Sequence, residues 1–345
     1  MDLIGGLRWR YQSWIEPRVH LHRSPQRMLA RWANNRRSAR APKPIAYLYA
    51  DPTNSGDYAS HLGIKQLVGR PGVELFGAPI ALRKTLNILR QGPQGAAPWH
   101  AVVVGGGSFL QSCFDDMWDG LISLDVPLVL FGIGAAEEPP ARLVTSAERM
   151  RRIGAVSKSI HVRDDFTREL FAAAGVDGVT TGICPAVNYL HPCATASKTR
   201  ATHLLHVVHD VDLALADVSG QALRSKAREL AAQLGLEYEE TRHMESVQSR
   251  LLARYARAAV VLSSRLHGCI FSYASGRPFV AIVCDSKLNA FLDTHVPQAP
   301  RVEVKTAMAS LSAATLKAAM AAPIPDPADA IAANVVRMRE ILAEL

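Results

Sequence analysis

The sequence lacks any apolar run long enough to cross a membrane. Its most apolar uncharged stretch, from Val126 to Ala136, falls well short of the roughly 20 residues that span a bilayer. A secretory signal is also missing, because Met1 to Leu7 is a short apolar stretch that is followed at once by Arg8 and Arg10. We therefore expect no transmembrane helix and a protein that stays in the cytoplasm.

Cysteines are few and are not arranged in pairs. The five of them include no C-x-x-C motif, and most lie beside apolar residues, which argues against a disulfide framework and a zinc site. We expect reduced thiols and no metal. The composition, 48% hydrophobic and 20% charged, excludes a largely disordered chain, and 345 residues suffice for two domains.

Acidic residues are almost absent from the first 43 positions. Nine arginines and one lysine face only Asp2 and Glu16 there, whereas the rest of the chain has 29 basic and 29 acidic residues. A generally basic nucleic-acid-binding body is therefore a poor explanation, and no nucleic-acid partner is expected. Residues 1–43 form a basic arm with three of the five tryptophans. We expect it to hold the protein at an anionic membrane surface, the inner face of the cell membrane; a solvated disordered tail is the alternative.

Short apolar runs alternate with longer helical patterns after the proline-rich residues 41–44. This alternation predicts βαβ units with parallel sheets. The first series of expected strands comprises Ile45 to Tyr49, Val73 to Phe76, Ala101 to Val104, Val126 to Phe131 and Ile160 to Val162. The second series comprises Leu204 to Val208, Ala258 to Leu262 and Pro278 to Val283, with a charged helix around Gln221 to Leu234.

These two series predict two α/β domains, residues 44–195 and residues 196–345. Pro185 to Ala201 is the expected linker, since it has neither helical nor strand periodicity and carries Pro192 in its middle. The second domain should end in two alanine-rich helices, Thr306 to Met320 and Pro327 to Leu345. The last helix has apolar residues at helical spacing, and this stripe requires a partner surface.

Two loops of the first domain follow strand ends, where ligands bind in parallel sheets. Asn54 and Asp57 follow the first strand and can contact a ligand, or simply order the turn and cap the next helix. After the third strand, Gly105, Gly106 and Gly107 allow backbone N–H groups to approach an anion, and close backbone packing explains them equally well. The pattern matches neither a dinucleotide-binding nor a Walker motif.

Arg163 follows the last expected strand of the first domain. A guanidinium there can bind a phosphate or a carboxylate through two parallel hydrogen bonds. A surface pair with Asp165 is the alternative interpretation. Gly132 and Gly134, which follow the preceding strand, allow the same two interpretations as the three earlier glycines.

The strongest candidates are Arg265 and His267, just after the expected strand Ala258 to Leu262. If the extended backbone continues, their side chains project to the same side. An anion-binding cation beside a residue that exchanges protons near neutral pH suits an active site. Lys287 follows the next strand and adds an ammonium group at the same sheet edge, with a solvated residue at a helix start as its alternative.

In combination these segments resemble the polysaccharide pyruvyl transferases, which attach a ketal-linked pyruvate to sugars using phosphoenolpyruvate. The resemblance covers about residues 45–292 and rests on the order and spacing of Asn54-Ser-Gly56-Asp57, Gly105-Gly106-Gly107-Ser108, Gly132-Ile-Gly134, Val162-Arg163-Asp164, Thr181-Gly182-Ile-Cys184-Pro185, Arg265-Leu-His267 and Asp285-Ser-Lys287. Some family members have an Asp-Pro pair in place of Cys184-Pro185, so no catalytic role is assigned there.

The resemblance implies a glycosyltransferase-B-like architecture of two Rossmann-like domains. It implies Arg163, Arg265 and Lys287 as anion ligands and His267 as the catalytic acid or base. The expected partners are phosphoenolpyruvate and a sugar acceptor, such as a lipid-linked precursor of a bacterial exopolysaccharide or cell-surface glycan, with no metal or redox cofactor. The alternatives are a nucleotide-sugar glycosyltransferase and a non-catalytic phosphosugar- or nucleic-acid-binding module.

Overall fold

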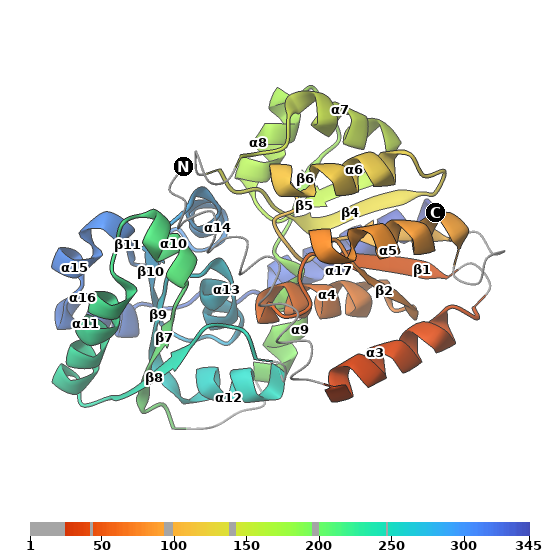
Figure 1. Ribbon diagram of the computed structural model, residues 1–345. Helices are drawn as coiled ribbons and strands as arrows, with labels where there is room; N and C mark the ends of the chain where they lie inside the picture. The colour runs from red at the N-terminus through yellow and green to blue at the C-terminus, as the bar shows by residue number, and fades with distance from the viewer. Residues whose placement is uncertain (1–24, 42–43, 93–98, 138–142, 195–199, 246–247) are drawn as a thin grey trace. The chain divides into compact units, whose positions relative to one another are not determined.

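The structure is a computed structural model that describes residues 25–41, 44–92, 99–137, 143–194, 200–245 and 248–345 (Figure 1). These residues form two compact units. The N-terminal unit comprises the described part of Arg10–Tyr189 together with Ala330–Leu345, and the C-terminal unit comprises the described part of Leu190–Asp329. The first 24 residues of the basic arm lie outside the described residues. In the part of the chain that the structure describes, no helix is both long and apolar enough for a bilayer crossing.

The N-terminal unit is built on a parallel sheet with the strand order β2-β1-β3-β4-β5-β6. Its strands are β1 (Ile45–Tyr49), β2 (Gly72–Phe76), β3 (Ala101–Val104), β4 (Leu128–Ile133), β5 (Ser157–Val162) and β6 (Thr180–Thr181). The first five confirm the predicted strands, with ends shifted by up to three residues, and β6 was not predicted. Since the chain runs from β1 out to β2 and returns to β3 on the other side of β1, the switch point of this sheet lies between β1 and β3.

Alternate residues of β1 pack on opposite faces of the sheet, as the two-residue period of a strand requires. Ala46 and Leu48 belong to the larger core, whose apolar residues also come from α5 (Pro79–Gln91), α6 (Asp115–Ile122), α7 (Ala147–Val156) and α8 (Asp165–Ala173). Ile45 and Tyr47 belong to the second core, which α4 (Ser55–Val68) and α17 (Ala328–Ala343) complete. A short 3₁₀ helix, η2 (Ser112–Phe114), precedes α6.

The last helix, α17, returns to the N-terminal unit, so the predicted extent of the second domain, residues 196–345, is wrong at its end. Met338 and Ile341 of α17 are buried in the second core of the N-terminal unit. Asn334 donates two hydrogen bonds, to the carbonyl of Ile183 at 2.9 Å and to Asn188 Oδ1 at 2.8 Å. The apolar stripe of this helix therefore has its partner surface in the unit that begins the chain.

The segment expected as a linker, Pro185 to Ala201, is not irregular throughout. It begins with α9 (Pro185–Ala194), a helix that includes Pro192 and crosses the boundary between the two units. Pro185 occupies the first helical position, where a missing N–H is harmless. Ala186, Val187 and Leu190 are fully buried, and this burial stabilises the helix despite the proline inside it.

Part of the basic arm is a helix, α3 (Pro25–Ser38), which lies along the edge strand β2 (Figure 1). Asn35 pairs with Glu74 in both directions, accepting from its backbone N–H at 2.8 Å and donating to its carbonyl at 3.0 Å. Asn34 donates to the carbonyl of Gly72 at 3.1 Å. The two asparagines therefore satisfy backbone groups that an edge strand otherwise leaves unpaired. Of the arm, residues 25–38 form this helix, and membrane binding by the arm stays a prediction.

The C-terminal unit holds a second parallel sheet, with the order β11-β10-β9-β7-β8. Its strands are β7 (His203–Val207), β8 (Glu237–Thr241), β9 (Ala258–Ser263), β10 (Phe279–Val283) and β11 (Arg301–Glu303). The chain runs from β7 out to β8 and returns to β9, so the switch point lies between β7 and β9. Three strands were predicted, while the polar β8 and the short β11 were missed.

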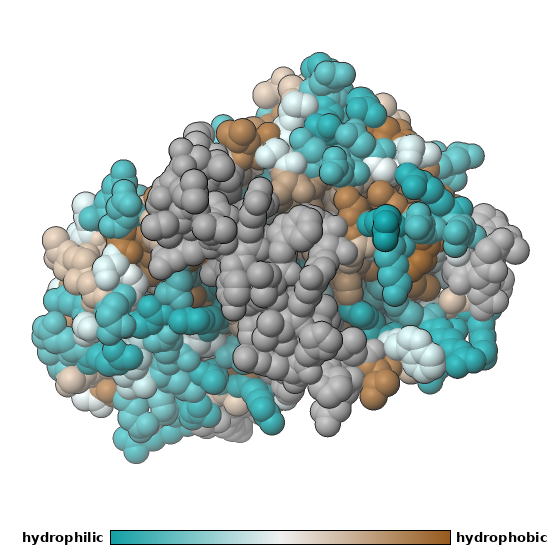
Figure 2. All heavy atoms as spheres, in the orientation of Figure 1, coloured by the Kyte–Doolittle hydropathy of each residue, from teal (hydrophilic) through white to brown (hydrophobic). Residues whose placement is uncertain are grey.

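Helices cover both faces of this second sheet (Figure 1). One face packs against α10 (Asp210–Leu215), α11 (Gly220–Gln233), α15 (Ala307–Ser310) and α16 (Ala313–Ala321). The strands β7, β9 and β10 also contact α12 (Gln248–Arg257), α13 (Leu266–Ala274) and α14 (Ser286–His295). The outer surface around α11 and β8 is mainly hydrophilic, as Figure 2 shows.

The helix predicted over Thr306 to Met320 is interrupted. The 3₁₀ helix η3 (Val304–Thr306) leads into α15, and α16 begins only after Ser312. The side chain of Ser312 accepts a hydrogen bond from the N–H of Thr315 at 3.2 Å and so caps the new helix. Alanine-rich composition predicted the helical content correctly but not this break.

Candidate active site

Asn54 and Asp57 lie at the switch point of the N-terminal sheet, after β1. Asn54 has an extended backbone and its side chain accepts a hydrogen bond from the N–H of Gly56 at 3.0 Å, which is the geometry of a helix cap. Asp57 is buried in the first turn of α4. Asn54 therefore has the structural role that the sequence allowed, and ligand contact by either residue stays a prediction.

The three glycines Gly105, Gly106 and Gly107 directly follow β3, the second strand of the same switch point. A Cβ on Gly105 would lie 2.1 Å from the carbonyl oxygen of Phe131, and a Cβ on Gly107 would lie 2.5 Å from the Cβ of Ala50. Gly106 has φ +80° and packs against the backbone of Asp57. Close packing thus accounts for all three glycines and brings the loops after β1 and β3 together. Phosphate binding by their backbone stays a prediction.

Arg163 is almost fully buried at the carboxyl end of β5, with 3% of its surface exposed. Its Nη2 donates to Ser108 Oγ at 2.8 Å, and its Nε lies 3.5 Å from Asp164 Oδ2. A Cβ on Gly134 would lie 2.3 Å from Arg163 Nε, so this glycine makes room for the guanidinium. Arg163 is therefore not the exposed surface residue of the alternative interpretation, and Asp165 pairs with Arg168 at 3.0 Å.

Asp164 both balances the charge of Arg163 and fixes the start of α8. Its Oδ1 accepts from the N–H of Thr167 at 2.8 Å and from its hydroxyl at 2.5 Å. Thr167 in turn accepts from the N–H of Ala135 at 3.0 Å. Buried hydrogen bonds therefore hold the Arg163 side chain in one position, which suits a guanidinium that recognises a fixed anion.

Cys184 carries no sign of a reactive thiol. Its Sγ lies 3.3 Å from Ser60 Oγ, and burial raises the pKa of the thiol even though Arg163 nearby lowers it. The following residue, Pro185, packs where a Cβ on Gly63 or Gly132 would collide with it. These contacts give the Cys184-Pro185 segment and Gly132 a packing role.

Arg265 and His267 do not share an extended backbone, so the predicted geometry of this pair is wrong. The strand β9 ends at Ser263, whose Oγ accepts from the N–H of Arg265 at 3.2 Å and donates to its carbonyl at 2.9 Å. Arg265 precedes the first residue of α13, and His267 lies in the first helical turn with only 8% of its surface exposed. Both residues still follow β9 at the carboxyl edge of the sheet.

Lys287 lies in the first turn of α14, after the neighbouring strand β10. Its Nζ contacts Asp285 Oδ2 and lies 4.0 Å from Asp212 Oδ2. Asp285 also caps the helix by accepting from the N–H of Leu288 at 3.0 Å. The ammonium group therefore shares its charge with two buried carboxylates rather than being simply solvated.

Two histidines of the C-terminal unit were missed from the sequence. His243 is completely buried and its Nε2 lies 2.5 Å from the hydroxyl of Tyr255, which donates to the carbonyl of Gly268 in α13. Burial and the charge of Arg265 lower the pKa of His243 well below its usual value. His209 follows β7 and contacts Asp212. The rule that ligands bind beyond strand ends would have singled out His209 and Asp212, because both lie within five residues of Val207, where β7 ends.

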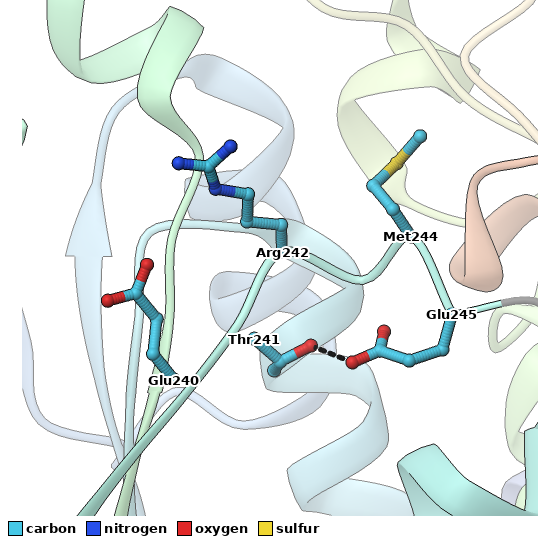
Figure 3. Close-up of a pocket in the computed structure, with 5 residues that line it drawn as sticks. All are labelled: Glu240, Thr241, Arg242, Met244 and Glu245. Carbon is cyan, nitrogen blue, oxygen red and sulfur yellow. Dashed lines mark hydrogen bonds between the residues drawn. The ribbon is translucent and has the colours of Figure 1, made fainter. Parts of the chain in front are cut away.

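An open hollow of about 400 Å³ lies beyond β8, at the edge of the C-terminal sheet (Figure 3). Glu240, Arg242 and Glu245 supply its charged lining, and the Thr241 hydroxyl donates to Glu245 Oε1 at 2.5 Å. Arg242 already pairs with Asp210 at 3.2 Å. Two carboxylates and one paired guanidinium make this hollow a poor phosphate site. Among the described residues, no three side chains of His, Cys, Asp or Glu gather as metal ligands.

The two parallel sheets define a glycosyltransferase-B-like α/β fold, and a solved structure shares it. A proposed UDP-N-acetylglucosamine 2-epimerase from Listeria monocytogenes matches with a TM-score of 0.53 and 11% identity, over 88% of this chain and 98% of that chain. UDP-GlcNAc 2-epimerase from Neisseria meningitidis, bound to UDP-GlcNAc, has a TM-score of 0.49 and 10% identity, over 87% and 100% of the two chains. The likeness to the Listeria monocytogenes structure, at 11% identity, shows the fold alone.

The sequence profile of the polysaccharide pyruvyl transferases matches residues 54–286, which is the bulk of the chain. The chain therefore belongs to the polysaccharide pyruvyl transferase family. The matched region includes residues of both units and contains every candidate residue except Lys287, which directly follows it. No curated protein sequence gives a significant match.

Proposed function

We propose that the protein transfers a pyruvyl group from phosphoenolpyruvate to a sugar of a bacterial exopolysaccharide or cell-surface glycan precursor. The family match over residues 54–286 is the observation that carries this proposal. The products are a cyclic ketal and inorganic phosphate. The donor and the sugar go beyond what the family match shows, and the chemistry of the basic residues and of His267 supports them.

The donor carries a phosphate and a carboxylate, so it requires several fixed cations. Arg163 is held by Ser108 and Asp164 in the N-terminal unit. Arg265 and Lys287 follow the neighbouring strands β9 and β10 in the C-terminal unit. We assign these three side chains to the anionic groups of the donor, with the glycine loop, Asn54 and Asp57 as further contacts. Preorganised charges of this kind stabilise the developing charges of a transition state.

The chemistry then follows from the enol phosphate of the donor. A proton is added to the methylene carbon, which makes C2 electrophilic, and a sugar hydroxyl attacks C2 while its proton goes to a base. The bond from C2 to the phosphate oxygen breaks with its electron pair on phosphate. A second hydroxyl of the same sugar then attacks C2, gives its proton to a base and closes the ketal. We assign the proton added to the methylene carbon to His267.

The test combines the protein with phosphoenolpyruvate and a panel of nitrophenyl and lipid-linked sugars. We expect inorganic phosphate to appear only with a suitable sugar, together with a product whose mass increases by one pyruvyl ketal. Parallel reactions contain UDP-sugars in place of phosphoenolpyruvate. Transfer from a UDP-sugar, with no phosphate released from phosphoenolpyruvate, would instead favour a nucleotide-sugar glycosyltransferase.

Binding without turnover of either donor would point to a phosphosugar-binding module. The two enzyme outcomes are separated by the group that the acceptor gains, a pyruvyl ketal or a sugar. Heat-treated protein serves as the control for spontaneous hydrolysis of phosphoenolpyruvate.

A further inference from the structure

His209 lies at the switch point of the C-terminal sheet, where ligands bind in open parallel sheets. It follows β7, and its backbone N–H donates to Ser264 Oγ at 2.9 Å. Ser264 in turn donates its own N–H to the carbonyl of Val207 at 3.0 Å. The loop after β7 is thus tied to the loop that leads from β9 into Arg265 and His267. His209 and Ser264, which are more than fifty residues apart in the sequence, therefore lie together at one edge of the sheet.

The imidazole of His209 is paired with a carboxylate that is nearly inaccessible. Its Nδ1 contacts Asp212 Oδ2, and the Asp212 side chain is 2% exposed while that of His209 is 20% exposed. A carboxylate in this position favours the tautomer with the proton on Nδ1 and leaves Nε2 as a proton acceptor. It also stabilises the imidazolium that forms when a proton is taken.

A histidine at the other end of β7 shows what an ordinary surface pair looks like in this unit. His203 begins β7, at the amino edge of the sheet, and its Nε2 lies 3.1 Å from Glu237 Oε2. The Glu237 side chain is 73% exposed. An imidazole paired with a carboxylate therefore occurs at both ends of β7. Of these two pairs, the one at the carboxyl edge has a buried carboxylate and lies beside other candidate residues.

We propose that His209, oriented by Asp212, is the base that takes the proton of the attacking sugar hydroxyl. This inference rests on the proposed pyruvyl transfer. As the oxygen of the hydroxyl bonds to C2 of the donor, its proton moves to Nε2 of His209. Phosphate leaves with the electron pair of the broken C2–O bond. The proton added to the methylene carbon comes from a different group, His267, so the two proton transfers have separate residues.

Asp212 and Lys287 are positioning residues in this arrangement. Lys287 Nζ lies 4.0 Å from the same carboxylate oxygen that His209 contacts, and it also contacts Asp285. One buried carboxylate thus links the base to a lysine assigned to the donor. The charge of Lys287 partly offsets that of the buried Asp212 carboxylate.

The test compares His209→Ala with His203→Ala in the full-length protein. We expect His209→Ala to lower kcat by about 10²–10⁴-fold, the usual contribution of positioned proton transfer, with little change in the KM for phosphoenolpyruvate. Added imidazole should restore part of the lost turnover. Asp212→Asn should lower kcat without rescue by imidazole, because the His209 ring then occupies the position but lacks its orienting carboxylate. His203→Ala should retain wild-type kinetics and still release phosphate.

Wild-type turnover in a folded His209→Ala variant would overturn this inference and leave the pyruvyl transfer intact. Absence of phosphate release by the wild-type protein with every sugar would instead count against the proposed function. A second measurement does not depend on the reaction: the nitrogen-15 NMR spectrum of histidine-labelled protein. We expect one signal of an Nδ1-protonated ring that disappears in His209→Ala and persists in His203→Ala. A His209 protonated only at Nε2 would overturn the inference.

Discussion

Arg163 illustrates how a glycine and a hydroxyl hold a buried guanidinium in place. Gly134 leaves the space that the side chain occupies, Ser108 accepts one of its hydrogen bonds, and Asp164 balances its charge. Replacing it with alanine would leave the buried Asp164 without its cation, so a loss of activity could reflect misfolding. Lysine keeps the charge and removes the planar fork, which makes it the sharper substitution.

Arg163→Lys should lower kcat/KM for phosphoenolpyruvate by roughly ten- to a hundredfold, since a hydrogen bond to a charged group contributes about 1.5–3 kcal/mol. The matched control is Arg168→Lys, because Arg168 lies on the adjacent α8 and pairs with Asp165 at 3.0 Å. Steady-state kinetics at varied phosphoenolpyruvate measure the effect. An unchanged KM and kcat in the Arg163→Lys variant would remove this residue from the donor site.

His267→Gln should retain the fold and lose most of the pyruvyl transfer. Glutamine has a similar size and can keep polar contacts, but it cannot exchange a proton near neutral pH. We expect kcat to fall by about 10²–10⁴-fold. Thermal unfolding of the variant checks the fold, and His203→Ala again controls for histidine loss in the same unit. Nearly normal turnover by a folded variant would assign His267 a structural role.

At the scale of single elements, α17 shows how one buried polar side chain fixes a helix. Asn334 Oδ1 lies 3.2 Å from His161 Nε2, and its Nδ2 donates to the carbonyl of Ile183. Burial lowers the pKa of His161 to about 4, even though the hydrogen bond to Asn334 raises it. The ring is therefore neutral at pH 7. A Cβ on Gly182 would lie 2.2 Å from the same ring, which gives the Thr-Gly segment of the family motif a packing role.

Asn334→Ala should destabilise the N-terminal unit by about 2–4 kcal/mol, because it leaves several buried polar groups unpaired at a typical cost of about 1–3 kcal/mol each. Chemical denaturation measures the free energy of unfolding. Arg339→Ala is the control, since Arg339 is exposed on the same helix. A change of less than about 0.5 kcal/mol, the usual effect of a surface substitution, would show that α17 does not depend on this network.

The helix α3 has two faces with different chemistry. Its inner face holds Asn34 and Asn35 against β2, whereas Leu29 and Trp32 are 64% and 60% exposed. The guanidinium of Arg36 lies 5.5 Å from the Trp32 ring centroid, and residues 25–41 contain no acidic side chain. We propose that this outer face binds an anionic membrane surface, with the aromatic and aliphatic side chains at the level of the lipid headgroups.

Two double variants should each weaken binding to anionic liposomes severalfold: Leu29→Ser/Trp32→Ser and Arg36→Gln/Arg37→Gln. The first removes apolar side chains from the lipid boundary. The second removes basic residues, each of which contributes about 1 kcal/mol near such a surface. Flotation at low and high salt measures the bound fraction. Val336→Ser is the control for loss of an exposed apolar residue, because Val336 is 54% exposed on α17. Equal flotation of all variants, or no flotation of the wild-type protein, would contradict the membrane role of α3.

At the scale of the whole molecule, the sequence predicted the eight most regular strands and the two α/β units, because buried parallel strands are short apolar runs between helical patterns. The polar edge strand β8 has no such signal, since its sequence is Glu-Tyr-Glu-Glu-Thr. The return of α17 depends on contacts between Asn334 and residues near position 183, which local periodicity cannot reveal. The predicted end of the second domain at residue 345 was wrong for the same reason.

The candidate site could be predicted to the level of strand ends but not of side-chain partners. Sequence position placed Arg163, Arg265 and Lys287 after strands, and the structure confirms those placements. Sequence position could not show that Lys287 contacts Asp285. It also could not show that the Ser263 hydroxyl bonds the backbone of Arg265 and that a helix begins before His267. These contacts depend on the three-dimensional fold and not on the spacing of the residues in the sequence.

The most direct measurement of the central claim follows the carbon that is transferred. The wild-type protein is incubated with phosphoenolpyruvate labelled with carbon-13 at C2 and with the sugar acceptor that releases most phosphate. We predict that the labelled carbon appears in the NMR spectrum of the purified sugar as a ketal carbon bonded to two sugar oxygens, in equal amount to the phosphate released. Recovery of the label only as free pyruvate or unreacted donor, with none in the sugar, would contradict the account.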